Sequence, residues 1–419
     1  MRVWLIKIAE PMPFKREQLG RTGSLAEYLS KNGHEVIWWK STYSHGDKKL
    51  YYNKHTQKKI NSHEVVIFLH SSIIYKKNVS FQRILFYKKL TCEFKKYAEK
   101  KMRPDIILCA WPPASLANAA IEFGKKNHIP VVLDARDLWP DTFEPYFPWK
   151  TSKIFLYFLK KQAARLFSEA AGITAVQDHA LRWACNYAGR TPAQFDRAIN
   201  IGTRVNDLSE RDKKECLSWW RGRGVTSCTW NMCFWGSLRN SGLDLDTCIK
   251  AVQRLEQKYP DIRLIIGGEG DSKKKLMEIA GGSKSIIFAG YLNGYQMETA
   301  MQICKVGVYS LINTEGFFDT ISNKAIQYMS GGLPILNSLK GLTNQLITEY
   351  SAGLTYREGD VEDCAEKIER MYLNLEDRNS MAINAKCLFE EKFNSDKINK
   401  DFENYLCRII AEYQRGNVK

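Results

Sequence analysis

Residues 229–271, TWNMCFWGSLRNSGLDLDTCIKAVQRLEQKYPDIRLIIGGEGD, decide the fold class. An apolar run opens this stretch and another closes it, and each is short enough to be a buried strand. Between them, residues 244–260 carry apolar side chains at helical spacing. A strand, a helix and a second strand in this order predict two parallel strands joined by a crossover helix. The stretch therefore indicates an α/β protein.

The same alternation extends in both directions from this stretch. Short apolar runs and helical patterns follow one another on each side, which is typical of a parallel sheet covered on both faces. We expect further strands at residues 2–9, 35–40, 64–70, 105–111, 129–135, 285–292, 306–312 and 333–338, and further helices at residues 22–33 and 114–127.

The length of 419 residues, of which 44% are hydrophobic, predicts two cores rather than one. A boundary near residues 199–209 separates the two alternating sets. We expect an N-terminal domain at 1–203 and a C-terminal domain at 204–394, facing each other across a cleft. Residues 395–414 form a helix with an apolar stripe, so the segment 395–419 must pack on one of the domains.

The cysteines exclude two classes of protein. Eleven cysteines are scattered without a CxxC pair or a Cys/His cluster. Neither a disulfide framework nor a structural zinc site fits this pattern, and free thiols in a reducing compartment fit it better.

No apolar run approaches the length that spans a bilayer, and the N-terminus lacks the apolar core of a signal peptide. We expect a cytoplasmic or peripheral protein.

The positive charge is concentrated in the first half of the chain. The whole chain has a net charge of +16, while residues 1–205 hold 34 basic and 17 acidic residues. Such a surface attracts an anionic partner: lipid headgroups, a lipid-linked pyrophosphate or a nucleic acid.

Residues 76–103 are the most basic segment, with ten basic and two acidic residues. Apolar side chains recur at helical spacing, at Ile84, Tyr87, Leu90, Phe94 and Tyr97. Either this stripe lies on an anionic membrane surface, or it packs on the domain and leaves the lysines solvated. Residues 152–167 repeat the basic and aromatic character.

Several segments together resemble family-4 glycosyltransferases of surface-polysaccharide assembly. Each is a weak signal alone, but they follow one another in the order and spacing of that family. They are RTGSLAEYLSKNGHEVIWWKSTYSH (21–45), LDARDLWPD (133–141), FWGSL (234–238), LIIGGEGD (264–271), IFAGYL (287–292) and SNKAIQYMSGGLPIL (322–336).

The resemblance implies a GT-B fold, in which two Rossmann-like domains bind an acceptor and a nucleotide sugar respectively. It implies transfer with retention of configuration, with the nucleotide sugar, UDP-linked by preference, as co-substrate and with no cofactor or obligatory metal. No DxD triplet stands where a metal-bound diphosphate would need it. The implied setting is the inner face of a bacterial membrane, with a lipid-linked or saccharide acceptor, as in lipopolysaccharide assembly.

Two groups of residues are candidates for contact with the donor diphosphate. Gly236 follows a strand and would let the backbone approach the phosphates, with Ser237 and Arg239 in the same turn. The resemblance makes Lys324 a partner of the leaving phosphate, beside Asn323, and we class Lys324, Arg239 and Asp137 as catalytic candidates. The alternatives are a surface arginine and an exposed helix lysine.

The family usually carries two glutamates, eight positions apart, before a Gly-x-Pro turn. This chain has Asp319 and Gln327 there, with Glu315 as a rival for the sugar contact. Gln327 shares a helix face with Lys324 and can still bond ribose hydroxyls. The departure leaves open an inactive, glycosyltransferase-like scaffold.

Further donor candidates are Gly268, Tyr291 and Leu292. Gly268 stands in a glycine turn after a strand, and Tyr291 and Leu292 follow the next strand, where a nucleobase would lie. A plain turn and plain core packing explain these residues equally well.

Acceptor candidates follow the strands of the first half. Gly20, Arg21 and Gly23 lie in the loop after the first strand, where α/β sheets place ligands. Asp137 follows another strand and would act as a general base, unless Arg136 forms a structural salt bridge with it or with Asp134.

His45, a further acceptor candidate, and His70 also follow predicted strands, although a lone histidine is more often structural.

Two other classes of protein fit the sequence less well. The basic half lacks a nucleic-acid-binding signature, and no GxGxxG follows the first strand as in a dehydrogenase.

Overall fold

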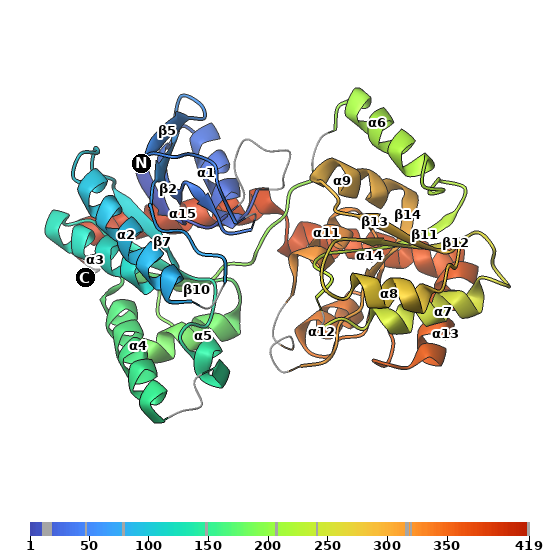
Figure 1. Ribbon diagram of the computed structural model, residues 1–419. Helices are drawn as coiled ribbons and strands as arrows, with labels where there is room; N and C mark the ends of the chain where they lie inside the picture. The colour runs from blue at the N-terminus through green and yellow to red at the C-terminus, as the bar shows by residue number, and fades with distance from the viewer. Residues whose placement is uncertain are drawn as a thin grey trace. The chain divides into compact units, whose positions relative to one another are not determined.

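The computed structural model describes residues 1–10, 19–46, 48–77, 80–146, 150–205, 208–239, 242–314, 318 and 321–416. The chain forms two compact units (Figure 1). Unit 1 comprises Met1–Ile201 together with Asp396–Lys419, and unit 2 comprises Gly202–Ser395.

Among its described residues, unit 1 contains an eight-stranded sheet in the order β10-β9-β8-β7-β1-β2-β6-β5. All neighbours are parallel except β5, which pairs antiparallel with β6 at the edge. The strands are β1 Arg2–Ile6, β2 Glu35–Ser41, β5 Thr56–Lys59, β6 Glu64–Leu69, β7 Ile106–Trp111, β8 Val131–Ala135, β9 Gly172–Ala175 and β10 Asp196–Ala198; β3 Tyr43–Ser44 and β4 Lys49–Leu50 form a separate hairpin.

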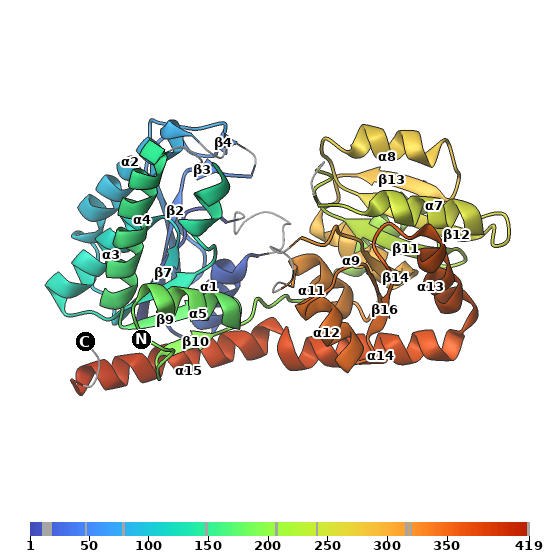
Figure 2. The same cartoon turned by 90° about the horizontal axis from the view of Figure 1, so that it is seen from below.

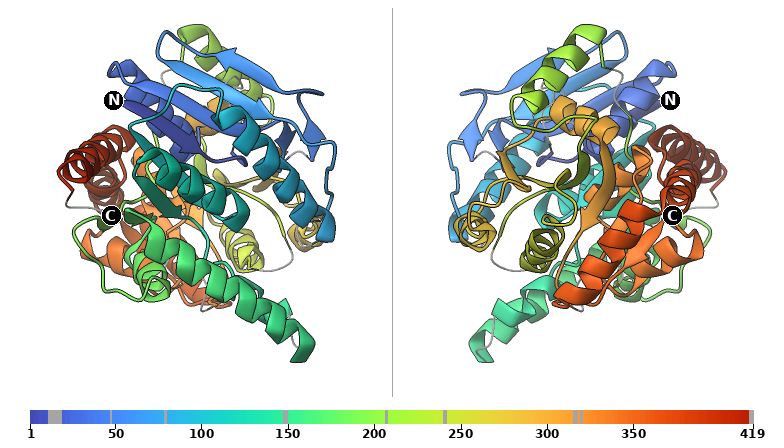
Figure 3. Two further views of the ribbon diagram at one scale, coloured as in Figure 1. Left: turned by 90° about the vertical axis from the view of Figure 1, so that its left-hand side faces the viewer. Right: turned by 90° about the vertical axis from the view of Figure 1, so that its right-hand side faces the viewer.

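Helices cover both faces of this sheet. On one face, α2 to α5 pack on side chains such as Trp4 and Trp39, and on the other, α1 and α15 pack on side chains such as Leu5 and Trp38 (Figures 2 and 3). Burial on both faces explains why the strands are continuous apolar runs. The helices are α1 Arg21–Lys31, α2 Phe81–Ala98, α3 Ala114–Asn127, α4 Lys150–Glu169, α5 Asp178–Tyr187 and α15 Ser395–Gln414, with a 3₁₀ helix at Asp141–Tyr146.

The stripe on α15 packs on unit 1. Phe402, Tyr405 and Ile409 are buried beside Leu25 and Leu29 of α1. The Tyr405 hydroxyl also donates to the backbone carbonyl of Phe195, at 2.8 Å. The last helix of the chain is therefore part of the N-terminal unit's core.

The stripe on α2 is likewise part of the core. Leu90 and Phe94 are fully buried, and Tyr87 and Tyr97 pack against the same cluster; of the five stripe residues, Ile84 is exposed. The interpretation of this stripe as a membrane-facing surface was therefore wrong. Periodicity shows that a helix has one apolar face but does not show what covers that face.

Unit 2 contains a six-stranded parallel sheet in the order β13-β12-β11-β14-β15-β16. Its strands are β11 Trp230–Trp235, β12 Ile262–Gly267, β13 Ile286–Gly290, β14 Cys304–Tyr309, β15 Ile335–Asn337 and β16 Gly353–Thr355. Its helices are α6 Glu210–Arg221, α7 Leu245–Leu255, α8 Lys273–Ala280, α9 Gly294–Ile303, α11 Asn323–Ser330, α12 Leu342–Glu349, α13 Val361–Leu373 and α14 Leu375–Lys392. Helices α7, α8 and α13 share a core with one face of the sheet.

The predicted strands and helices are confirmed, with shifts of a few residues at their ends. The short strands β9, β10 and β16 and the polar edge strand β5 were not predicted from the sequence. Each is too short or too polar for a clear periodic signal. No helix in the described ranges is long and apolar enough to cross a membrane.

Candidate functional site

Two glycine turns meet at the carboxyl ends of β11 and β12 in unit 2. The Gly236 amide donates to the Gly267 carbonyl at 3.0 Å, and the Leu238 amide donates to the Glu269 carbonyl, also at 3.0 Å. Gly268 has φ +135°, and a Cβ atom there would collide with the carbonyl oxygen of Gly236. A glycine at residue 268 is therefore required by the close contact of the two turns.

Lys324 lies directly against the first of these turns. It is the second residue of α11, and its Nζ would be 3.1 Å from a Cβ atom placed on Gly236. The same nitrogen is 3.7 Å from the centre of the Phe234 ring. Two predicted donor residues, distant in sequence, are thus in contact.

The Lys324 ammonium group is poorly solvated. The side chain is half-buried, and burial lowers its pKa to about 7. Within the described part of the chain, no carboxylate pairs with it, and the Phe234 ring offers a cation–π contact. A buried cation without a counter-ion is costly, and an anionic ligand would remove that cost.

The start of α11 adds a second attraction for anions. Its first N–H groups lack helical acceptors, and the helix dipole places partial positive charge there. Asn323 is the first residue of this helix and is exposed. Lys324, this helix end and the Gly236 turn together form a site that suits a phosphate group.

Gln327 lies one turn further along α11. Its Oε1 accepts from the indole Nε1 of Trp235 at 2.9 Å, so β11 holds the amide in place. Trp235 also packs edge-on against Tyr328, with ring centres 4.8 Å apart. The residue that replaces the family's glutamate is therefore fixed beside Lys324 and the carboxyl end of β11.

The other predicted donor residues border these turns. Ser237 and Arg239 are exposed, and the Arg239 Nε donates to the Ser237 hydroxyl at 3.1 Å. Leu292 is buried against Gly267, whereas Tyr291 is 69% exposed. The core-packing interpretation fits Leu292, and the exposed ring of Tyr291 is accessible to a ligand.

Two donor candidates, Glu315 and Asp319, lie outside the described residues. Their role in contacting the sugar stays a prediction.

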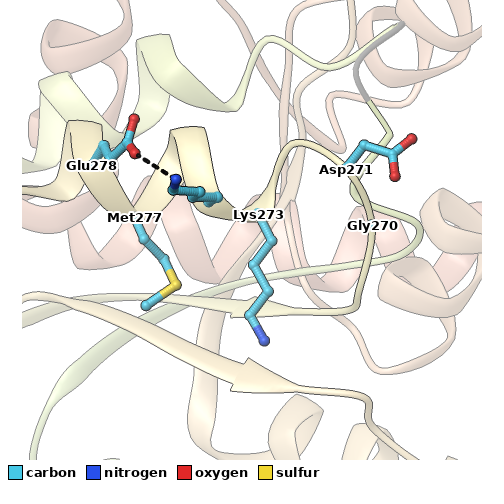
Figure 4. A pocket seen from close by; sticks show the side chains of 6 residues that line it. Gly270, Asp271, Lys273, Met277 and Glu278 are labelled. Atoms are coloured by element: carbon cyan, nitrogen blue, oxygen red, sulfur yellow. Dashed lines mark ion pairs between the residues drawn. The ribbon is translucent and has the colours of Figure 1, made fainter.

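A hollow of about 530 Å³ lies beside the second glycine turn (Figure 4). It is lined by Gly270, Asp271, Lys273, Lys274, Met277 and Glu278, and Lys274 pairs with Glu278 at 4.0 Å. All these residues come from one turn and α8. Because no second element of the described chain lines it, this hollow is not assigned to the donor.

In unit 1, the corresponding sheet edge carries a paired cluster of charges. The Arg136 guanidinium donates to both Asp134 and Glu10, with the Glu10 contact at 3.1 Å. Burial by itself would raise the pKa of Asp134, but Arg136 and Arg21 outweigh it and hold that pKa well below its usual range. The Arg136 salt bridge is thus made with Asp134 and Glu10, not with Asp137.

Arg21 belongs to the same buried cluster. Its guanidinium donates to the carbonyls of Ile199 and Asn200, both at 2.6 Å, and to Asp134 at 3.3 Å. The Phe402 ring of α15 lies 5.0 Å from it. These contacts favour a structural role and leave the guanidinium little access to a ligand.

The two glycines beside Arg21 are explained by packing around Glu10. A Cβ atom at Gly20 would lie 2.9 Å from the Glu10 carboxylate, and one at Gly23 would lie 3.1 Å from Trp38. The Gly23 amide donates to Glu10 at 3.2 Å.

Asp137 and His45 remain near the carboxyl ends of strands in unit 1. The Asp137 side chain is exposed, just beyond β8. His45 Nδ1 lies 2.7 Å from the Tyr75 hydroxyl. His70 Nδ1 lies 3.1 Å from the Thr42 hydroxyl, which suits a structural role.

Sequence reasoning missed Glu10, Phe234 and Trp235 as parts of these sites. Glu10 follows the first strand in the same way as the predicted loop residues, so its position was a usable signal. No local signal places Phe234 under Lys324, because ninety residues separate them. The described residues include no cluster of three His, Cys, Asp or Glu side chains that would hold a metal ion.

Comparison with known families identifies both halves of the chain. Residues 21–196 match the model described as Glycosyltransferase Family 4, and residues 232–387 match Glycosyl transferases group 1. The chain is a GT-B glycosyltransferase. The predicted fold class and enzyme class of this glycosyltransferase are therefore confirmed.

A curated relative of this glycosyltransferase is the sulfoquinovosyl transferase SQD2 of Arabidopsis thaliana, 23% identical over 295 residues. The alignment covers 70% of this chain and 54% of the relative. The chain thus spans about half the length of that relative.

Solved structures share the fold of this glycosyltransferase along nearly its whole length. Sucrose-phosphate synthase of Thermosynechococcus elongatus is 14% identical with a TM-score of 0.71, and the match covers 98% of this chain and 99% of that chain. The HepE protein of Anabaena in complex with UDP-glucose is 15% identical with a TM-score of 0.63, covering 97% of this chain and 100% of that chain.

Proposed function

We propose that this glycosyltransferase moves a sugar from a UDP-linked donor to a lipid-linked or saccharide acceptor. The observation that carries the proposal is the position of Lys324 against the Gly236 turn, at the start of α11. A half-buried cation with no carboxylate partner in the described residues suits a diphosphate. The UDP and UDP-glucose bound in HepE structures support the choice of nucleotide.

In the proposed reaction, UDP leaves as its bond to the sugar breaks. Negative charge grows on the departing phosphate, and the Lys324 ammonium and the helix N-terminus stabilise that charge. Gln327, held by Trp235, contacts the ribose hydroxyls. The acceptor oxygen forms a new bond to the anomeric carbon of the sugar, with retention of configuration, and Asp137 takes the proton of the acceptor hydroxyl. We further propose that the diphosphate binds without an obligatory metal.

The proposed setting is the cytoplasmic face of a bacterial membrane, in the assembly of surface polysaccharide such as lipopolysaccharide. Support comes from the resemblance and from the charge of the first half, where residues 1–205 hold 34 basic and 17 acidic residues. Exposed lysines of α2, such as Lys88, Lys95 and Lys96, add attraction to anionic headgroups within 76–103.

A thermal-shift panel of nucleotides and sugar nucleotides tests donor binding. A ligand that binds only the folded form raises the apparent stability. We expect a UDP-sugar to raise the unfolding temperature and Lys324→Ala to remove most of that rise. Lys275→Ala, an exposed lysine of α8, is the matched control and should keep it. No rise with any sugar nucleotide would overturn the proposal.

An inactive scaffold is the second candidate, favoured by the Asp319 and Gln327 departures. Release of UDP from the sugar nucleotide that binds separates the two. Binding together with acceptor-dependent UDP release supports the enzyme, and binding without turnover across a panel of lipid-linked and saccharide acceptors supports the scaffold.

A further inference from the structure

The two halves of α4 differ in what covers them. In the carboxyl half, Ala163 and Phe167 are fully buried, and the Phe167 ring packs 4.9 Å from the Trp111 ring. In the amino half, Ile154, Tyr157 and Phe158 are 60%, 63% and 61% exposed. One helix therefore anchors in the core at its end and presents large apolar side chains at its start.

The three exposed side chains form one patch on the helix and are not scattered over the surface. Ile154, Tyr157 and Phe158 lie at spacings of three and four, so they share one side of the helix. The Tyr157 and Phe158 rings also contact each other, with centres 5.9 Å apart. Figure 3 shows one end of α4 extending beyond the neighbouring helices of unit 1, and Figure 1 shows that this is its amino end. Contiguous exposed apolar side chains mark an interaction surface.

The surroundings of this surface are basic. Lys161 follows it within one turn and is exposed, whereas Lys160, also within one turn, is paired with Asp141 and Glu144. Helices α2 and α3, which carry further lysines, lie in the same layer, joined to each other by the pair Lys95–Glu122. A helix with aromatic and aliphatic side chains beside lysines is typical of segments that lie in the headgroup region of a membrane.

Charge favours a bilayer over a second copy of the chain. Two copies would bring together halves that each carry 34 basic and 17 acidic residues, and this repulsion opposes association. Lysine is also depleted in protein interfaces. An anionic lipid surface complements the charge and accepts the apolar side chains.

We propose that the amino-terminal half of α4 inserts into an anionic membrane, with Ile154, Tyr157 and Phe158 as its anchors. This rests on the proposed function, because a lipid-linked acceptor must be reached from the membrane surface. In this proposal α4 inserts into the bilayer, and the lysines of α2 contribute electrostatic attraction to the headgroups.

Flotation with vesicles tests the insertion. Full-length protein is mixed with vesicles of phosphatidylcholine alone or with added phosphatidylglycerol, without donor or acceptor. The triple variant Ile154→Gln, Tyr157→Gln, Phe158→Gln should lower the partition coefficient on anionic vesicles at least about tenfold. The matched control replaces three helix residues of unit 2 that are 51%, 63% and 65% exposed, Met277→Gln, Leu373→Gln and Ile383→Gln, and should bind as the wild type does.

Three results would overturn the proposal: a wild type that ignores anionic vesicles, a triple variant that binds them as well as the wild type, or a wild-type dimer that the triple variant converts to monomers in sedimentation. Circular dichroism checks that each variant is folded. The UDP-sugar thermal shift, measured on the same proteins, should be equal in all of them. Loss of that shift in every protein would instead indicate failure of the proposed function.

Discussion

The cationic side chains at the carboxyl ends of the two sheets of this glycosyltransferase differ in their partners. In unit 1, the buried Arg21 is bonded to Asp134, and the half-buried Arg136 is bonded to Asp134 and Glu10. In unit 2, Lys324 has no carboxylate partner among the described residues and lies on an aromatic ring. The same edge of a parallel sheet thus carries an ion-paired cluster in one unit and, within the described residues, a cation without a carboxylate partner in the other.

This difference separates structural charges from functional ones. An ion-paired cluster has little to gain from an anionic ligand, because both arginines already pair with carboxylates; among the described residues only the buried Arg21 Nε lacks a hydrogen-bond partner in this cluster. A desolvated cation beside a helix N-terminus gains from any anion that reaches it. We therefore assign the unit 1 cluster to stability and Lys324 to donor binding.

The largest expected effect is on stability, from Asp134→Ala. Removing this carboxylate leaves Arg21, Arg136 and Thr174 without an acceptor that they share. Breaking a buried ion pair in this way should lower the free energy of unfolding by about 3–5 kcal/mol. Urea unfolding followed by tryptophan fluorescence measures it.

Asp137→Ala is the matched control for this substitution. It removes an exposed carboxylate three residues further along the chain, and the free energy of unfolding should change by less than about 0.5 kcal/mol. Equal effects of the two substitutions would remove the distinction between the paired cluster and its surroundings.

The next effect is on catalysis, from Lys324→Ala. Loss of a cation at the leaving phosphate should lower kcat by about 10²–10³-fold. The fold should be retained, because burying a cation that has no carboxylate partner among the described residues costs stability rather than adding it. Initial rates of UDP release at saturating donor measure the loss. A kcat within a factor of two of the Lys275→Ala control would contradict the assignment.

Donor affinity should also depend on pH through Lys324. Burial lowers the pKa of this group to about 7 in the free protein, and a bound diphosphate favours the charged form. Binding then takes up a proton above pH 7, so Kd should rise with pH, by up to about tenfold per unit. Calorimetric titrations from pH 7 to about 9 test this. A Kd that is flat across this range would show that Lys324 does not contact the phosphates.

The smallest effect is expected from Arg239→Ala. This side chain is exposed and bonded to Ser237 in the same turn, so solvent screens its charge. We expect Kd for the donor to rise by about three- to tenfold and kcat to change less. The same calorimetric titration measures it, and a loss as large as that of Lys324→Ala would make Arg239 the principal cation.

Most of the fold could be predicted from the sequence. The continuous apolar run of β7 is short enough to indicate a strand buried on both faces, and the helix at 114–127 was predicted to the residue. The short strands β10 and β16 were not predicted, since three residues carry no periodicity. Their pairing is decided by neighbouring strands.

The site could be predicted in part. Gly236, Lys324 and Gln327 were singled out through the family resemblance, and the structure places them together. Arg21 was expected at a ligand and is buried with Asp134 instead. A sequence names charged residues but does not show which of them already have partners.

The pattern of apolar residues by itself determined the alternating α/β architecture, because period and run length follow from local backbone geometry. The tertiary structure alone decided which apolar faces are buried and which charges are paired. It buried the stripe of α2, exposed the start of α4, paired Arg136 and left Lys324 against a glycine turn and a phenylalanine ring. Burial and ion pairing depend on residues far apart in the chain, and only folding brings these together.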